Sequence, residues 1–265
     1  MTNQNDPIRE FEDEKVERVA QYESDKEWSA QTNAWVRRSF EQKYMYNFNW
    51  MGRPIIQFPQ DILAMQEIIF AVQPDLIIET GIAHGGSLIF SASMLELNAA
   101  CGGPADARVL GVDIDIRQHN REAIEAHPMF KRISMIQGSS ISDETITQVR
   151  VHAAGKKKVL VLLDSNHTHE HVMAELRAYA DLVSVGSYCV VFDSIVEDMP
   201  EDMFPDRPWA PGDNPKTAIR QYMSELEKAG WRTESGSPLK YECDRHVEGK
   251  LLITVAPEGY LKRIL

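Results

Sequence analysis

LIIETGIAHGGSLIFSA, residues 76–92, is the stretch that decides the fold, because an apolar run ends there in an acidic residue and a Gly-rich turn that opens a helix. Beyond the carboxyl ends of strands in an open α/β sheet lies a ligand crevice, and Gly81, Gly85 and Gly86 let backbone approach a ligand closely. The pattern departs from the dinucleotide motif, since Glu79 precedes the turn and would repel a pyrophosphate. An acid at this position suits a ligand with a cationic part, such as the amino group and sulfonium of S-adenosylmethionine.

The remaining sequence alternates apolar runs with helical patterns, which predicts a mostly parallel sheet with right-handed crossovers. Strands are expected at residues 75–80, 109–115, 133–140, 159–166 and 187–194, and helices at 62–72, 86–100, 121–127, 143–155, 169–183 and 216–230. Asp61 is a plausible N-cap of the helix at 62–72. Residues 231–236 and 250–257 are expected to close the sheet as an antiparallel pair. We predict an N-terminal helical cap at 1–50, a single α/β domain at 51–265, and a loop at 195–213 long enough to be a lid.

Composition narrows the function classes. The chain has 265 residues, of which 43% are hydrophobic, and 28 basic against 40 acidic residues give a net charge of −12. This charge disfavours nucleic acid and anionic membrane surfaces as partners. The N-terminal residues show neither the basic nor the apolar region of a signal peptide, and no apolar stretch approaches the ~20 residues that cross a bilayer. We therefore expect a cytoplasmic protein.

Polar residues after the second and third predicted strands extend the ligand site. Asp113 closes the run at 109–113, where an acid can accept both ribose hydroxyls of an adenosine; Asp115 is a weaker candidate. Gly138 and Ser140 follow the next strand and would lie against the adenine edge.

Two further carboxylates follow the fourth and fifth predicted strands, Asp164 and Asp193. Adjacent parallel strands bring such residues to within ~5 Å, where they either share a proton or hold a hard cation, so the sequence predicts a magnesium site. His167 has the chemistry of a general base, although capping of the next helix is an alternative. A zinc site of His167, His169 and His171 is disfavoured because the three cannot face one point.

Four segments together resemble the cephalosporin hydroxylase family, which includes rhamnosyl O-methyltransferases. They are LIIETGIAHGGSLIFSAS (76–93), LDSNHTHEHV (163–172), VGSYCVVFDS (185–194) and LLITVAPEGYLKR (251–263). The resemblance covers residues 50 to 263 approximately. It implies a Rossmann-like class I methyltransferase with a seven-stranded sheet, S-adenosylmethionine as cofactor, and a Mg²⁺ ion that positions an acceptor hydroxyl.

The resemblance also assigns metal ligands. Asp164 and Asp193 carry over, but Ser194 stands where related enzymes have the second residue of a pair, so Ser194, Glu197 or Asp198 could supply the third ligand. Gln57 is expected near the methionine end of the cofactor.

The sequence therefore predicts a magnesium-dependent O-methyltransferase acting on a sugar, glycan or similar hydroxylated metabolite. Asp164 and His167 would be catalytic, and the donor would be held by a set of strand-end residues: Glu79, Thr80, Gly81, Gly85, Ser87, Asp113, Gly138, Ser140 and Asp164. The alternatives are a non-haem iron oxygenase built on His167, His169 and Asp164, and a non-catalytic binding protein on the same fold. The aromatic segment at 44–50 suggests a homo-oligomer.

Overall fold

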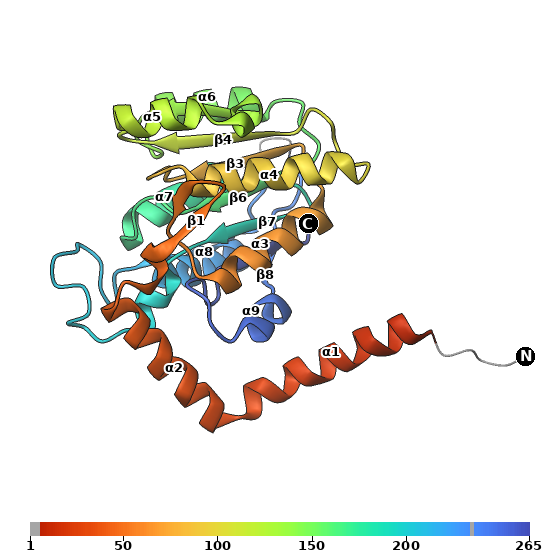
Figure 1. The fold of residues 1–265 in the computed structure, drawn as a ribbon, viewed down its shortest axis with the longest axis vertical. Helices are drawn as coiled ribbons and strands as arrows, with labels where there is room; N and C mark the ends of the chain where they lie inside the picture. The colour runs from red at the N-terminus through yellow and green to blue at the C-terminus, as the bar shows by residue number, and fades with distance from the viewer. Residues whose placement is uncertain (1–5, 234–235) are drawn as a thin grey trace, which may run out of the picture.

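The structure, a computed structural model, describes residues 6–233 and 236–265. At its centre lies a seven-stranded sheet of order β5-β4-β3-β6-β7-β9-β8 (Figure 1). The strands are β3 (Leu76–Thr80), β4 (Arg108–Asp113), β5 (Ile133–Gln137), β6 (Val159–Leu163), β7 (Tyr188–Val191), β8 (Tyr241–Cys243) and β9 (Tyr260–Arg263). β3 to β7 run parallel, while β9 is antiparallel to both β7 and β8. The predicted class I methyltransferase architecture is confirmed.

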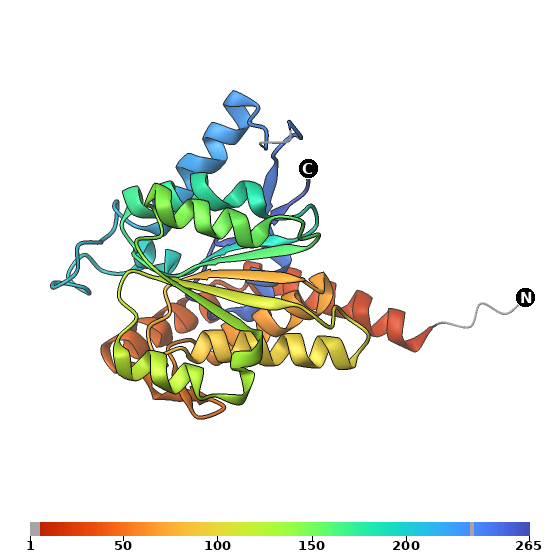
Figure 2. The same ribbon diagram turned by 90° about the horizontal axis from the view of Figure 1, so that it is seen from above.

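Helices cover both faces of the sheet, which explains why β3 and β6 are buried along their whole length. One face carries α3 (Pro59–Val72), α4 (Gly86–Ala100) and α5 (Gln118–Glu125), and the other α6 (Asp143–Ala153), α7 (His169–Tyr179) and α8 (Pro215–Ala229), as Figure 2 shows. Each face has its own hydrophobic core. Three short 3-10 helices lie between these elements, η2 (Pro128–Arg132), η3 (Ala180–Leu182) and η4 (Ser194–Asp198). Within the described residues, none of the helices combines the length and apolarity needed to span a bilayer.

The N-terminal part consists of two long helices followed by a small hairpin. The elements are α1 (Pro7–Ser24), α2 (Lys26–Glu41), the short η1 (Tyr44–Asn47), β1 (Phe48–Trp50) and β2 (Arg53–Ile55). α1 runs away from the sheet and contacts α9 (Arg245–Leu251) (Figure 1). The β1–β2 hairpin crosses the boundary expected at residue 50, and the division into a cap and a domain stays a prediction.

Two expectations for the elements were wrong. Asp61 is not an N-cap, because α3 already begins at Pro59 and the Asp61 side chain is fully buried. Its carboxylate instead accepts hydrogen bonds from the Thr254 hydroxyl, the Val255 N–H and the Tyr260 hydroxyl. Burial raises the pKa of Asp61 to about 6.

These bonds explain the second error, the position of the last strand pair. They hold residues 254 and 255 as a loop against α3, so the segment expected to be a strand at 250–257 contains the end of α9 and this loop. The closing pair is β8 with β9 instead. Residues 234 and 235, in the middle of the other expected strand, lie outside the described residues.

Candidate active site

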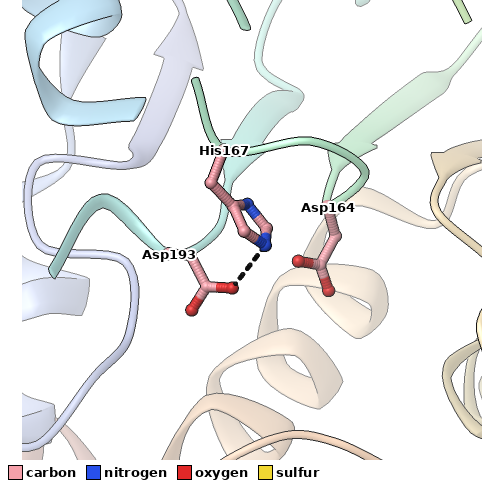
Figure 3. Close-up of side chains that lie close together, drawn as sticks. All are labelled: Asp164, His167 and Asp193. Atoms are coloured by element: carbon pink, nitrogen blue, oxygen red, sulfur yellow. Dashed lines mark ion pairs between the residues drawn. The ribbon is translucent and has the colours of Figure 1, made fainter. Parts of the chain in front are cut away.

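Three titratable side chains meet where β6 and β7 end. Asp164 follows β6 and Asp193 follows β7, and the register of Leu163 with Val191 brings the two strand ends side by side. Together with His167, they offer one ligand atom each, all within 4.8 Å of one another (Figure 3). The Nε2 atom of His167 lies 3.0 Å from Oδ2 of Asp193. The structure thus brings Asp164, His167 and Asp193 together, as the sequence predicted.

Negative charge is concentrated around Asp164. Withdrawal of its carboxylate from water, followed by repulsion from Asp193 and then Glu79, raises the pKa of Asp164 well above its usual value. The Gln57 amide donates a hydrogen bond of 3.3 Å to Oδ2 of Asp164. Two carboxylates with an imidazole are a donor set that a divalent cation satisfies, and such a cation would relieve the repulsion. The two carboxylates are oxygen ligands of the kind that Mg²⁺ prefers, so this part of the cluster fits Mg²⁺.

A small cavity adjoins this cluster on the α4 side of the sheet. Glu79, Ser87, Gln57 and Asp164 line it with apolar side chains such as Phe90. The Ser87 hydroxyl donates to Oε1 of Glu79, and burial raises the pKa of Glu79 to about 7.

Among the described residues, one buried acceptor that lines this cavity has no hydrogen-bond partner, Oε1 of Gln57, while Oε2 of Glu79 and Oγ of Ser91 form no hydrogen bond of normal geometry although Ser91 lies close enough to Glu79 to lower its pKa. The Gln57 oxygen is an acceptor only, and so is the Glu79 carboxylate when it is ionised; buried acceptors require donors. A ligand with an ammonium group would supply those donors. Ser91 was missed by sequence reasoning, although its position one helical turn after Ser87 could have indicated it.

The Gly-rich turn between β3 and α4 is enclosed by backbone on two sides. A Cβ atom on Gly81 would lie 2.0 Å from the carbonyl oxygen of Asp164, and one on Gly86 would lie 2.1 Å from that of Pro54. Gly81 and Gly85 also have positive φ angles of 89° and 81°. These glycines are thus required by the packing of the turn itself, whatever ligand the turn binds.

Asp113 supports the same turn from the end of β4. Its Oδ2 accepts hydrogen bonds from the N–H groups of Ile82 at 2.7 Å and Ala83 at 3.3 Å, and its Oδ1 accepts one from Asp115 at 2.9 Å. Asp115 itself is exposed. Thr80, at the end of β3, is fully buried and its hydroxyl has no hydrogen-bond partner among the described residues. The structure therefore gives Asp113 a structural role that the sequence did not predict.

Other predicted residues are engaged elsewhere. Ser194 is fully buried and donates its hydroxyl to the Pro257 carbonyl at 2.6 Å, so the expectation that it is a metal ligand was wrong. Glu197 and Asp198, the alternatives, contact Asn214 and Lys216 respectively.

Ser140 belongs to a polar network behind the site. Its hydroxyl lies 3.1 Å from Nε2 of His171, which lies equally far from the Ser165 hydroxyl. Ser165 donates to the fully buried Glu175 at 2.7 Å. A Cβ on Gly138 would meet the Thr145 hydroxyl, which would have to move to accommodate it.

The three histidines point to three different places, as expected. His169 contacts Thr217 and Gln221 of α8, and His171 contacts the serines just described. Only His167 of the three faces Asp164. The iron site drawn from His167, His169 and Asp164 is therefore not formed.

The mixed seven-stranded sheet and the strand-end site define a protein of the class I methyltransferase fold. A solved structure described as "cmcI-D160 Mg-SAM" shares this fold, with a TM-score of 0.53, 16% identity, and coverage of 83% of this chain and 78% of that one.

The chain belongs to the rhamnosyl O-methyltransferase/CmcI family, whose model matches residues 42–264. It is 29% identical over 235 residues to a rhamnosyl O-methyltransferase of Mycobacterium tuberculosis (strain H37Rv), covering 86% of this chain and 85% of the relative. It is 29% identical over 234 residues to the same-named protein of Mycobacterium leprae, covering 86% and 90%.

Proposed function

We propose that this protein is an O-methyltransferase that uses S-adenosylmethionine and Mg²⁺ to methylate a hydroxyl of a sugar, glycan or similar small metabolite. One observation carries the proposal: Asp164 belongs both to the cavity with unsatisfied acceptors and to the cluster with His167 and Asp193. A donor in the cavity and an acceptor hydroxyl at the cluster would then be neighbours. Placing two reactants within near-attack distance supplies much of the rate in such a transfer.

The donor would lie with its methionine end in the cavity, where Glu79, Gln57 and Ser87 meet its amino group. Gly81 and Gly85 would let the backbone of the turn approach it. Asp113 would face the ribose, and Thr80, Gly138 and Ser140 would contribute around the adenosine or stabilise the loops that do.

Asp164 and Asp193 would hold Mg²⁺, which when bound acts as a Lewis acid that lowers the pKa of the acceptor hydroxyl. His167 would accept the proton of that hydroxyl, and Asp193 orients its imidazole from 3.0 Å. If His167 is a metal ligand instead, it cannot be the base, and the two roles predict different effects of substitution.

Isothermal titration with S-adenosylmethionine and with Mg²⁺ tests this assignment on the wild type and three variants. Asp164→Asn and Asp193→Asn are expected to weaken Mg²⁺ binding by more than tenfold. His167→Gln should leave Mg²⁺ binding intact but abolish methyl transfer from labelled donor to a panel of glycosides. Loss of Mg²⁺ binding in His167→Gln would show that the histidine is a metal ligand. Absence of S-adenosylmethionine binding in the wild type would refute the proposed methyltransferase function.

The sequence raised two other functions. A non-haem iron oxygenase needs two histidines and one carboxylate, whereas this cluster holds one histidine and two carboxylates. A non-catalytic binding protein on this fold would be stabilised by S-adenosylmethionine without transferring its methyl group.

We retain the expectations of a homo-oligomer, a cytoplasmic location and no nucleic acid or membrane partner as predictions. The homo-oligomer was expected from the aromatic segment at 44–50, but this segment is partly engaged within the protein, because Met45 is buried and Trp50 packs edge-on against Phe90. Tyr46 of that segment is exposed, and exposed apolar residues also occur on α1, among them Ile8 and Phe11. Light scattering coupled to size-exclusion chromatography measures the oligomeric state directly.

A further inference from the structure

The loop between η4 and α8 is fixed at its base beside the candidate active site. Glu197 accepts hydrogen bonds from the Gly212 N–H, at 2.8 Å, and from the Asn214 amide. Asp213 accepts one of 2.7 Å from the N–H of His169, at the start of α7. The loop at 199–213 therefore has a defined position next to His167.

Trp209 is the residue by which this loop reaches the site. Its ring centroid lies 4.7 Å from that of His167, at an interplanar angle of 80°. Trp209 is half-buried, so part of its surface is open to a ligand. Trp50, the other tryptophan that could be considered for stacking on a sugar, donates its indole N–H to Ser93 and is part of the packing of α4.

Arg207 lies over the same tryptophan, with its guanidinium carbon 5.2 Å from the Trp209 ring centroid. The guanidinium carbon is therefore no more than about 10 Å from the imidazole of His167, a span that one sugar unit with a substituent can bridge. Arg207 is exposed, and within residues 6–233 and 236–265 no ion pair is formed by it, although Asp206 is its direct neighbour.

Two other cationic side chains that follow this loop in the chain do form ion pairs. Lys216 is paired with Asp198, and Arg220 with Glu258. Arg207 is thus a stacked guanidinium beside an otherwise acidic site in a chain of net charge −12. Guanidinium groups bind carboxylates and phosphates through two parallel hydrogen bonds, and stacking on an aromatic ring orients them for it.

We propose that the acceptor is an anionic sugar, whose carboxylate or phosphate is bound by Arg207 while its ring packs on Trp209. This inference rests on the proposed function and adds the substrate class. Arg207 is then a specificity-determining residue that selects for charge, and the acidic cluster at Asp164 and Asp193 faces the hydroxyl to be methylated. The face of Trp209 contributes to the affinity for any sugar, whereas the Arg207 guanidinium contributes only to the affinity for a charged one.

Titration of the full-length protein with three probes tests the proposal, in the presence of Mg²⁺ and S-adenosylhomocysteine. The probes are methyl glucuronide, glucose 6-phosphate and neutral methyl glucoside. We expect at least one charged probe to bind about tenfold more tightly than the neutral one, and the identity of that probe separates carboxylate from phosphate. Arg207→Gln should abolish the preference, while Arg9→Gln, an exposed charge change on α1, should retain it.

Equal affinity for all three probes, or no binding of any of them, would overturn the inference. So would a preference that survives in Arg207→Gln, because the anion would then be bound by a group other than Arg207. Donor binding is measured in the same samples: if S-adenosylhomocysteine binds but no charge preference exists, only the substrate class is wrong. If S-adenosylhomocysteine does not bind, the proposed methyltransferase itself fails.

Discussion

Substituting Gly81 tests whether the Gly-rich turn is dictated by packing against β6 as well as by its backbone angle. An alanine Cβ at this position would lie 2.0 Å from the carbonyl oxygen of Asp164, whereas real Cβ atoms essentially never come closer than 3.0 Å. The turn or the end of β6 must therefore move by about 1 Å. Gly102 provides a matched control, because its φ of 91° nearly equals the 89° of Gly81, but a Cβ atom on Gly102 would have no other atom within 4 Å.

The two variants separate two free-energy costs. A left-handed backbone costs a non-glycine residue about 1–2 kcal/mol, and this term is common to Gly81→Ala and Gly102→Ala. Overpacking in a well-packed interior adds about 1–3 kcal/mol, and this term belongs to Gly81→Ala alone. We therefore expect the free energy of unfolding to fall by about 1–2 kcal/mol in Gly102→Ala and by about 2–5 kcal/mol in Gly81→Ala.

Urea denaturation followed by circular dichroism measures both values. Because the displaced carbonyl belongs to Asp164, Gly81→Ala should also weaken Mg²⁺ and S-adenosylmethionine binding, whereas Gly102→Ala should not. Equal destabilisation of the two variants would show that the backbone angle alone accounts for the glycine and would refute the close approach to β6.

Three further changes have defined outcomes. The pKa of Glu79 is about 7, so the affinity for S-adenosylmethionine should rise by up to about tenfold between pH 6 and 8 as the carboxylate ionises. Isothermal titration should show that this rise is lost in Glu79→Gln but kept in Glu227→Gln. Asp61 has a pKa of about 6 in the folded state against an ordinary value of 3.8, so the folded state binds the proton more tightly. The free energy of unfolding should therefore fall by roughly 3 kcal/mol as the pH rises from about 4 to 6. Urea titrations of Asp61→Asn should lack this fall, and the same pH dependence in the variant and the wild type would contradict the assignment. Asn214 caps α8 from a fully buried position, so Asn214→Ala should lower the free energy of unfolding by about 2 kcal/mol. Ser142 caps α6, and Ser142→Ala should lower it by about 1 kcal/mol. Equal losses in the two variants would argue that burial of the cap adds nothing.

The sequence was sufficient for the parallel core of the fold and for the centre of the site. Strands that are buried on both faces are mostly apolar, so β3, β4, β6 and β7 could be recognised from their apolar runs. Because parallel strands end at the same edge, the positions of Asp164 and Asp193 in the sequence were enough to place them together.

The remaining features depend on contacts between distant segments. Asp61 has the local pattern of a helix cap, but its three hydrogen-bond partners lie 193, 194 and 199 positions further along the chain. Ser194 directly follows Asp193 of the candidate metal site, yet its hydroxyl donates a hydrogen bond to the carbonyl of Pro257 instead. No local pattern specifies either partner, since each depends on how the C-terminal segment packs.

Helix α2 touches the loop that carries Trp209 and Arg207. The rings of Phe40, in α2, and Phe204, in the loop, meet edge to face with centroids 5.7 Å apart, and Phe40 also contacts Phe58 at the start of α3. Removal of α1 and α2 would therefore leave one side of the acceptor loop without its support. If the acceptor packs on Trp209 as proposed, substitutions in α2 act on acceptor choice through this aromatic contact.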